Sequence, residues 1–234
     1  MAQQFAGMVW RDRMVAGLGA VGGIVLVMLA GHWLAPLFSL WTGDSIPPII
    51  APIGASAVLV FAVPASPLAQ PWPVIGGNGL SALVGTAVAM AMPDPALAAG
   101  LAVGLAIVVM SLARCLHPPG GGTALLATVG GKAAAAASFA FAPTIVLANA
   151  LVLVAAGWLW HRWSGRSYPH RPVVVPTAVP MPPAIEALLH RDDIDKALAD
   201  MGESFDISIE DLDMLLHRAE AHAAERGAVL ATGR

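Results

Sequence analysis

Long apolar runs with few polar interruptions dominate the first two thirds of the chain. They cover roughly residues 14–36, 46–63, 75–92, 96–113, 118–131 and 139–161. About 20 apolar residues in a helix cross the roughly 30 Å hydrocarbon core of a bilayer, so these runs predict up to six membrane segments. The charged residues from Met14 to Trp160 are only Asp44, Asp94, Arg114 and Lys132. So few charges could not cover a soluble domain, and we expect an all-α integral membrane protein.

The second and fifth apolar runs are short and begin with prolines that small residues follow. Pro52–Ala57 and Pro119–Ala124 lie 67 residues apart and share the pattern P-x-G-small-[Ser/Thr]-A. Proline suits the first turn of a helix, because the N–H that it lacks has no helical partner there. We therefore expect each run to enter the membrane as a loop and to begin a helix at depth.

At the same offset of 67 residues, the helix expected at 75–92 corresponds to residues 142–159. Helices at 14–36 and 96–113 precede the two broken segments. The chain thus predicts two copies of a helix, a broken helix and a helix. If all six segments cross the membrane, one copy is inverted relative to the other, an arrangement that recurs in transporters. If the broken segments are re-entrant hairpins, four helices cross.

Basic residues beside the apolar runs indicate the orientation. The flanking arginines are Arg11 and Arg13 before the first run, and Arg162, Arg166 and Arg171 after the last. Cytoplasmic loops carry the excess of Lys and Arg, so both termini should be cytoplasmic. Six crossings would also place Arg114 in the cytoplasm, which favours them slightly over four. We expect a multi-pass protein of a bacterial inner membrane.

Composition divides the chain into three parts. Residues 1–166 form the predicted transmembrane domain. Residues 167–183 form a linker that contains six prolines and should be semi-extended. Residues 184–234 form a polar tail with helical spacing, in which 12 acidic and four basic residues between Glu186 and Arg226 give a net charge of −8 (4 − 12). Such a tail avoids an anionic membrane surface, so we expect short cytoplasmic helices.

The fifth run is the candidate site. A helix that begins there at Gly121 or Gly122 would point unpaired N–H groups and a partial positive charge into the membrane. The second run offers an equivalent start near Gly54, and the two starts together would suit a small anion. The candidate substrate-binding residues are Gly54, Ala55, Ser56, His117, Pro118, Pro119, Gly120, Gly121, Gly122 and Thr123. Close packing of helices through small residues is the alternative interpretation.

Three further polar residues could line a pore: Asn78, Arg114 and Asn149. Each has a structural alternative, namely a helix cap, an interfacial anchor and an interhelical hydrogen bond. The pattern contains no H-E-x-x-H, C-x-x-C or G-x-S-x-G motif, so we expect neither an enzyme nor a metal or cofactor site. The net charge of −3 gives no indication of a nucleic-acid partner. Carboxylates are absent from the predicted helices, so any proton coupling would fall to His117.

Two sequence blocks carry a family resemblance. Leu116–Leu125 reads L-H-P-P-G-G-G-T-A-L and resembles the signature of the HPP family of membrane proteins, named for its His-Pro-Pro. Pro52–Phe61, followed by Pro64–Pro71, resembles that family's glycine-serine block. The resemblance covers about residues 10–165. Family members are usually described as transporters, and plant chloroplast and cyanobacterial members are linked to nitrite. The resemblance therefore implies transport, with nitrite as the leading substrate.

Transport of a small monovalent anion is the function we expect from the chain. A passive anion channel of the same architecture is one alternative. A membrane scaffold or sensor, whose acidic tail binds a partner, is another. A homo-oligomer is compatible with each of these functions.

Overall fold

The computed structural model describes residues 10–42, 47–129, 138–170 and 212–216. The chain divides into two compact units, Met1–His170 and Arg171–Arg234. In the second unit the described residues, 212–216, are helical. The rest of the predicted tail, and the predicted linker beyond His170, lie outside the described residues.

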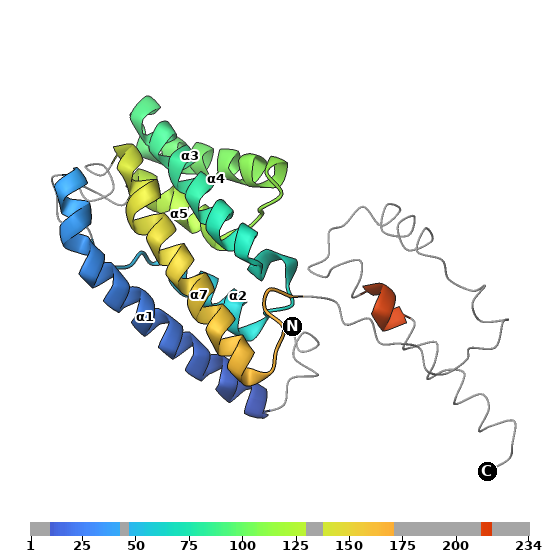
Figure 1. Cartoon of the computed structure of the whole chain (residues 1–234). Helices are drawn as coiled ribbons and strands as arrows, with labels where there is room; N and C mark the ends of the chain where they lie inside the picture. Colours follow the sequence, from blue (N-terminus) through green and yellow to red (C-terminus); the bar gives the residue numbers. More distant parts are fainter. Residues whose placement is uncertain (1–9, 43–46, 130–137, 171–211, 217–234) are drawn as a thin grey trace, which may run out of the picture. The chain divides into compact units, whose positions relative to one another are not determined.

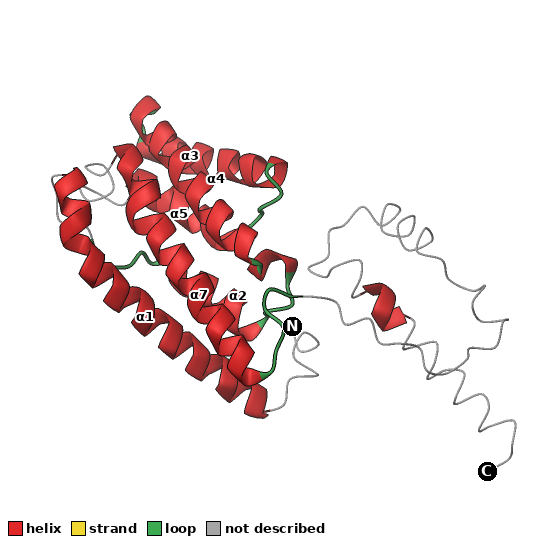
Figure 2. Cartoon of the chain, viewed as in Figure 1, coloured by secondary structure: helices red, strands yellow, loops and turns green. Residues whose placement is uncertain are grey.

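Every regular element in the described residues is a helix or a helical turn (Figure 2). The α-helices of the first unit are α1 (Trp10–Thr42), α2 (Pro52–Ala62), α3 (Asn78–Ala91), α4 (Pro95–Leu112), α5 (Pro118–Val129) and α7 (Leu147–Ser164). The 3₁₀ turns are η1 (Pro67–Ala69) and η3 (Ser138–Phe141). Two π-helical turns, η2 (Pro73–Gly77) and η4 (Ala142–Val146), run directly into α3 and α7.

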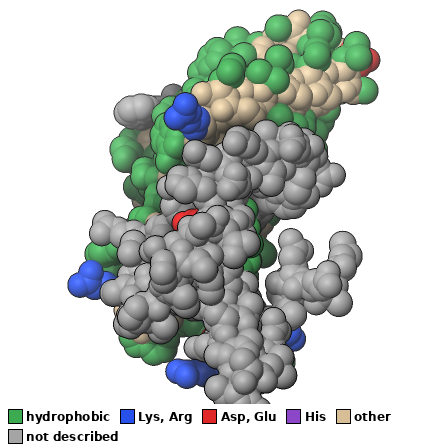
Figure 3. All heavy atoms as spheres, turned by 90° about the vertical axis from the view of Figure 1, so that its right-hand side faces the viewer, with side chains coloured by type: hydrophobic (Ala, Val, Ile, Leu, Met, Phe, Trp, Pro, Cys, Tyr) green, Lys and Arg blue, Asp and Glu red, His purple; other side chains and the backbone are tan. Residues whose placement is uncertain are grey.

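Four stretches of helix are long and apolar enough to cross a membrane. They are Trp10–Leu40, Pro73–Ala91, Pro95–Leu112 and Phe139–Ser164. Large apolar side chains such as Leu40 and Leu112, each 81% exposed, point outward from them. Figure 3 shows hydrophobic side chains over most of the described surface in view, with Lys and Arg at isolated places. This surface suits lipid, and the expected all-α membrane protein is confirmed.

The two broken segments form short helices. α2 has 11 residues and α5 has 12, which at 1.5 Å per residue is about 16–18 Å, or roughly half of the hydrocarbon core. α5 begins at Pro118, so the predicted start at Gly121 or Gly122 is wrong. Proline already has the φ angle that the first helical turn needs, and the helix can therefore start three residues earlier. The described residues thus contain four helices of spanning length rather than six.

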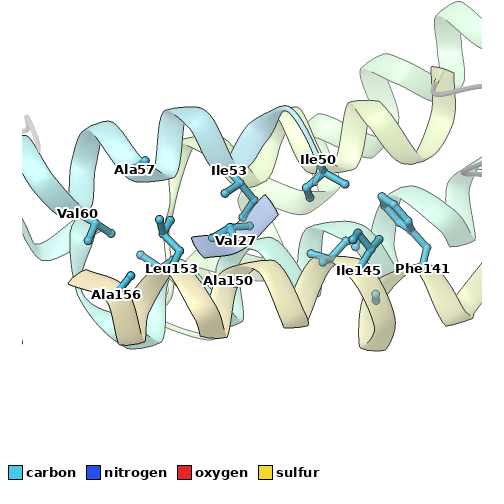
Figure 4. Packing of buried hydrophobic residues seen from close by; sticks show 14 of the residues in the cluster. Val27, Ile50, Ile53, Ala57, Val60, Phe141, Ile145, Ala150, Leu153 and Ala156 are labelled. Carbon is cyan, nitrogen blue, oxygen red and sulfur yellow. The ribbon is translucent and has the colours of Figure 1, made fainter. Parts of the chain in front are cut away.

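The helices pack in two groups. α1 lies beside α7 and α2, whereas α3, α4 and α5 pack on one another (Figure 1). α2 also contacts both α7 and α5. Figure 4 shows the larger apolar core, in which Ile53 and Val60 of α2 lie near Val27 of α1 and Leu153 of α7. A second core of mostly small residues joins α4 to α5.

Candidate functional site

His117 lies immediately before α5 and is fully buried. Its Nε2 is 2.8 Å from Ser56 Oγ in α2, and its Nδ1 is 2.9 Å from the Leu68 carbonyl oxygen in η1. A carbonyl oxygen can only accept, so Nδ1 carries a proton. In the neutral ring Nε2 then accepts a hydrogen bond from the Ser56 hydroxyl. The imidazole thus connects the two short segments that share the P-x-G pattern.

Asn78, the first residue of α3, extends the contact to α5. Its Nδ2 donates to Ser56 Oγ at 3.3 Å and to the Val74 carbonyl oxygen at 2.9 Å. Thr123 Oγ1 in α5 donates to Asn78 Oδ1 at 2.7 Å. Ser56, Asn78, His117 and Thr123 each have 0% exposure. We call these four residues the polar cluster.

The hydrogen bonds of the polar cluster run in one direction. Thr123 donates to Asn78, Asn78 to Ser56, Ser56 to His117, and His117 to the Leu68 carbonyl. Each group donates to the next, so these buried polar atoms have partners and no formal charge is needed. A fully satisfied network of this kind fixes the relative positions of α2, α3, α5 and η1.

Glycines allow the backbones around His117 to approach one another. A Cβ added at Gly77 would lie 2.5 Å from His117 Cβ and 2.8 Å from the Cys115 carbonyl oxygen. A Cβ at Gly120 would lie 2.8 Å from Ser81 Oγ and 2.9 Å from the Gly77 carbonyl oxygen. Side chains at these two positions would force α5 away from the π turn, and the polar cluster would open.

The N–H groups at the predicted helix starts are not free. Gly54 N–H donates to the Ala51 carbonyl at 3.0 Å, and Gly120 N–H donates to the His117 carbonyl at 2.8 Å. Pro118 and Pro119 have no N–H, so the first N–H group of α5 is that of Gly120, which is already paired. The two short segments still meet, because a Cβ at Gly122 would lie 3.4 Å from Pro52 Cγ. They come together through side chains rather than through unpaired backbone donors.

The candidate substrate-binding residues therefore divide into two sets. Ser56, His117 and Thr123 belong to the polar cluster, and Pro119 and Gly120 are buried beside it. Gly121 is partly exposed, and the exposed candidates are Gly54, Ala55, Pro118 and Gly122. The four exposed positions are thus not enclosed with the polar cluster, and their role in substrate binding stays a prediction.

The three candidate pore residues lie in different surroundings. Asn78 is part of the polar cluster. Asn149 in α7 accepts from Ile50 N–H at 3.0 Å and donates to the Pro48 carbonyl at 3.1 Å. Arg114 is exposed, has a φ of 53° and lies in the turn after α4. The structure thus joins Asn78 to His117 through Ser56, and it shows Asn149 bonded to the non-helical backbone before α2.

Two parts of the site have no sequence signal of their own. The Leu68 carbonyl is a backbone group, so the residue type at position 68 says nothing of its role. The position of Asn78 depends on the π turn η2, and π turns occur often at functional sites but have no sequence pattern. Within the described residues no group of three or more His, Cys, Asp or Glu side chains could hold a metal ion.

Four spanning helices, with two half-length helices that meet at a buried polar cluster, define a multi-pass membrane protein with interrupted membrane segments. The chain belongs to the HPP family: the family model described as "HPP, transmembrane region" matches residues 6–169. The resemblance drawn from the two sequence blocks is thereby confirmed.

Curated relatives come from Dictyostelium discoideum. One, named a transmembrane protein, is 39% identical over 127 residues, which are 52% of this chain and 44% of the relative. A second transmembrane protein is 44% identical over 82 residues, which are 33% of this chain and 26% of the relative. The matches thus span less than half the length of either relative. No solved structure matches the chain.

Proposed function

We propose that the chain carries a small monovalent anion across the membrane, with nitrite as the leading substrate, and that the anion binds at the polar cluster. The observation that supports this function is the cluster itself. Two hydroxyls, an amide and an imidazole, all with 0% exposure, meet where two half-length helices converge. Buried polar groups inside a membrane domain typically mark solute pathways.

The donors of the polar cluster favour an anion. Ser56, Thr123 and the Asn78 amide each offer an N–H or O–H group, and His117 can gain a proton to become a donor at both ring nitrogens. The four side chains include no carboxylate that would repel a negative charge. A cation would have to displace the N–H groups of His117 and Asn78 from the carbonyls of Leu68 and Val74.

Two hydroxyls can release their present partners without being left unsatisfied. Ser56 Oγ is 3.3 Å from the Pro52 carbonyl oxygen, and Thr123 Oγ1 is 3.4 Å from the Pro119 carbonyl oxygen. Each hydroxyl has a single proton, so an entering anion would have to compete with these acceptors for it. The cluster has 0% exposure, so entry also requires the surrounding helices to open, as in a carrier with alternating access.

An internal repeat would provide that movement. We assign α1, α2 and α3 to one copy and α4, α5 and α7 to the other, and the two copies are inverted if each short helix and the loop beside it complete a crossing. The packing agrees with this pairing, because α1 lies on α7 as α4 lies on α3, and α2 contacts α7 as α5 contacts α3. A π turn precedes the third helix of each copy. Rocking of one repeat against the other is a common transport movement.

Flux through proteoliposomes tests the proposal. Purified wild-type protein should take up nitrite above empty vesicles, and uptake should saturate with concentration. His117→Gln should lower the flux at least about tenfold, because a hydrogen bond to a charged group contributes about 1.5–3 kcal/mol. Asn149→Leu is the matched control: Asn149 is also buried and bonds backbone groups, those of Ile50 and Pro48, but it lies outside the polar cluster.

Three results would contradict parts of the proposal. If another solute moves and nitrite does not, the substrate assignment is wrong. A high, non-saturating, voltage-driven flux would identify a channel. If Asn149→Leu and His117→Gln lower the flux per folded protein equally, the polar cluster is not the distinct substrate site.

A further inference from the structure

Three consecutive residues receive hydrogen bonds from two different parts of the chain. The Leu68 carbonyl accepts from His117 Nδ1 at 2.9 Å. The neighbouring Ala69 carbonyl accepts from Tyr168 Oη at 3.0 Å, and Gln70 Oε1 accepts from the His170 N–H at 2.8 Å. The polar cluster and the segment after α7 therefore hold the same short stretch of backbone.

This stretch belongs to a turn, residues 64–70, that is bonded to itself. Gln70 Nε2 donates to the carbonyls of Pro64 and Ser66 at 2.9 and 2.8 Å. Leu68 N–H donates to Ser66 Oγ at 3.1 Å, and Ala69 N–H donates to the Ser66 carbonyl at 3.0 Å. A turn with so many internal bonds moves as one body, so a shift of the Ala69 carbonyl also displaces the Leu68 carbonyl.

Tyr168 is itself firmly placed. It is 5% exposed, and its ring centroid lies 5.5 Å from that of His161. The chain reaches it from α7 through Gly165, whose φ of 75° ends the helix in a left-handed turn. Burial raises the pKa of the Tyr168 phenol, which therefore remains a protonated donor.

We infer that Tyr168 is a positioning residue for His117, acting through the 64–70 turn. The phenol fixes the Ala69 carbonyl, the turn carries the Leu68 carbonyl with it, and that carbonyl keeps the proton on His117 Nδ1. The other nitrogen, Nε2, then faces Ser56 as an acceptor. The effect on the ring is independent of the transported solute, whereas the effect on flux rests on the proposed function.

Tyr168→Phe isolates the hydroxyl, because phenylalanine retains the ring beside His161. Full-length protein with ¹⁵N-labelled histidine in lipid nanodiscs would report the ring nitrogens, with the His117→Gln spectrum assigning the His117 signals. We expect Tyr168→Phe to move the His117 Nδ1 and Nε2 resonances and to lower nitrite flux several-fold. Gln70→Met removes the bonds of Gln70 to Pro64, Ser66 and His170 and should move the same resonances.

Ser164→Ala is the matched control. It removes a hydroxyl at the end of α7 that bonds the His161 carbonyl and does not bond the 64–70 turn. Its His117 signals should match those of the wild type. If Tyr168→Phe only lowers the melting temperature and leaves the His117 resonances in place, the inference is wrong. If the resonances move but wild-type protein transports no nitrite, positioning stands and the proposed substrate fails.

Discussion

At the scale of single residues, the buried amides have two distinct tasks. Asn78 connects hydroxyl side chains within the polar cluster, whereas Asn149 bonds only backbone, at Ile50 and Pro48. The stretch at 48–50 is not helical, so its backbone needs partners from elsewhere. Asn149 supplies one acceptor and one donor for it and so holds the approach to α2.

Asn149→Leu should therefore affect stability more than transport. The change leaves the buried Ile50 N–H without its partner, at a cost of about 1–3 kcal/mol. We expect a lower melting temperature in detergent and little change in flux per folded protein. Asn78→Leu provides the contrast. Asn78 connects Ser56 and Thr123 in the polar cluster, so its loss should abolish flux. If Asn149→Leu abolishes flux in protein that remains folded, Asn149 belongs to the solute path.

The sequence indicated the chemically distinctive residues of the site but not their partners. The sequence predicts Ser56, His117 and Thr123 because they accompany the expected helix starts, beside proline and glycine. Their partners include the carbonyls of Leu68 and Val74. Backbone acceptors are the same at every position, so only the fold could identify them.

At the scale of elements, glycines occur both at tightly packed helix contacts and at open positions. A Cβ added at Gly85 of α3 would lie 2.5 Å from the Ala124 carbonyl oxygen in α5. A Cβ at Gly54 of α2 would meet nothing within 4 Å. The same residue type therefore serves close helix packing at one position and not at the other.

This contrast gives a paired prediction. Gly85→Ala should push α3 from α5 and reduce the yield of folded protein, because backbone rather than a flexible side chain blocks the new Cβ. Gly54→Ala should fold at least as well as the wild type, since alanine favours a helix over glycine by about 0.5–1 kcal/mol. Size-exclusion profiles and melting temperatures of the two variants measure the difference. Equal stability of the two variants would contradict the packing seen between α3 and α5.

The two short helices were foreseen because proline followed by small residues is a strong local signal. The lengths of these helices could not be predicted, because the apolar runs in the sequence continue past the helix ends. The run expected to end at 63 includes Val63, where α2 has already stopped. Pro64 explains the end: it has no N–H to donate to the Val60 carbonyl, and His161 Nε2 lies 2.8 Å from that oxygen instead.

At the scale of the first unit, both ends of the helical domain lie together. Arg166 after α7 forms an ion pair of 3.1 Å with Asp12 in the first turn of α1. Arg11, Arg13 and Arg162 belong to the same terminal turns. A partly exposed ion pair contributes little stability, but its geometry places the start of α1 and the end of α7 at the same end of the helical unit.

Cysteine labelling can identify that side. The chain has one cysteine, Cys115, which is buried. In a Cys115→Ala background, Arg11→Cys and Ser167→Cys should both react with a membrane-impermeant maleimide only from the cytoplasmic side. Opposite accessibility of the two positions would contradict an even number of crossings between them. Agreement from the outside would reverse the proposed orientation and leave the fold unchanged.

The single direction of the hydrogen bonds in the polar cluster also bears on how a proton could move along it. Hydroxyls and imidazoles can relay protons, but an amide accepts at oxygen and donates at nitrogen, with no proton able to pass between the two atoms. Asn78 stands between Thr123 and Ser56, so a proton cannot pass from one hydroxyl to the other through its side chain. If the polar cluster is the substrate site, a proton that His117 gained during transport would therefore not reach Thr123 along these hydrogen bonds.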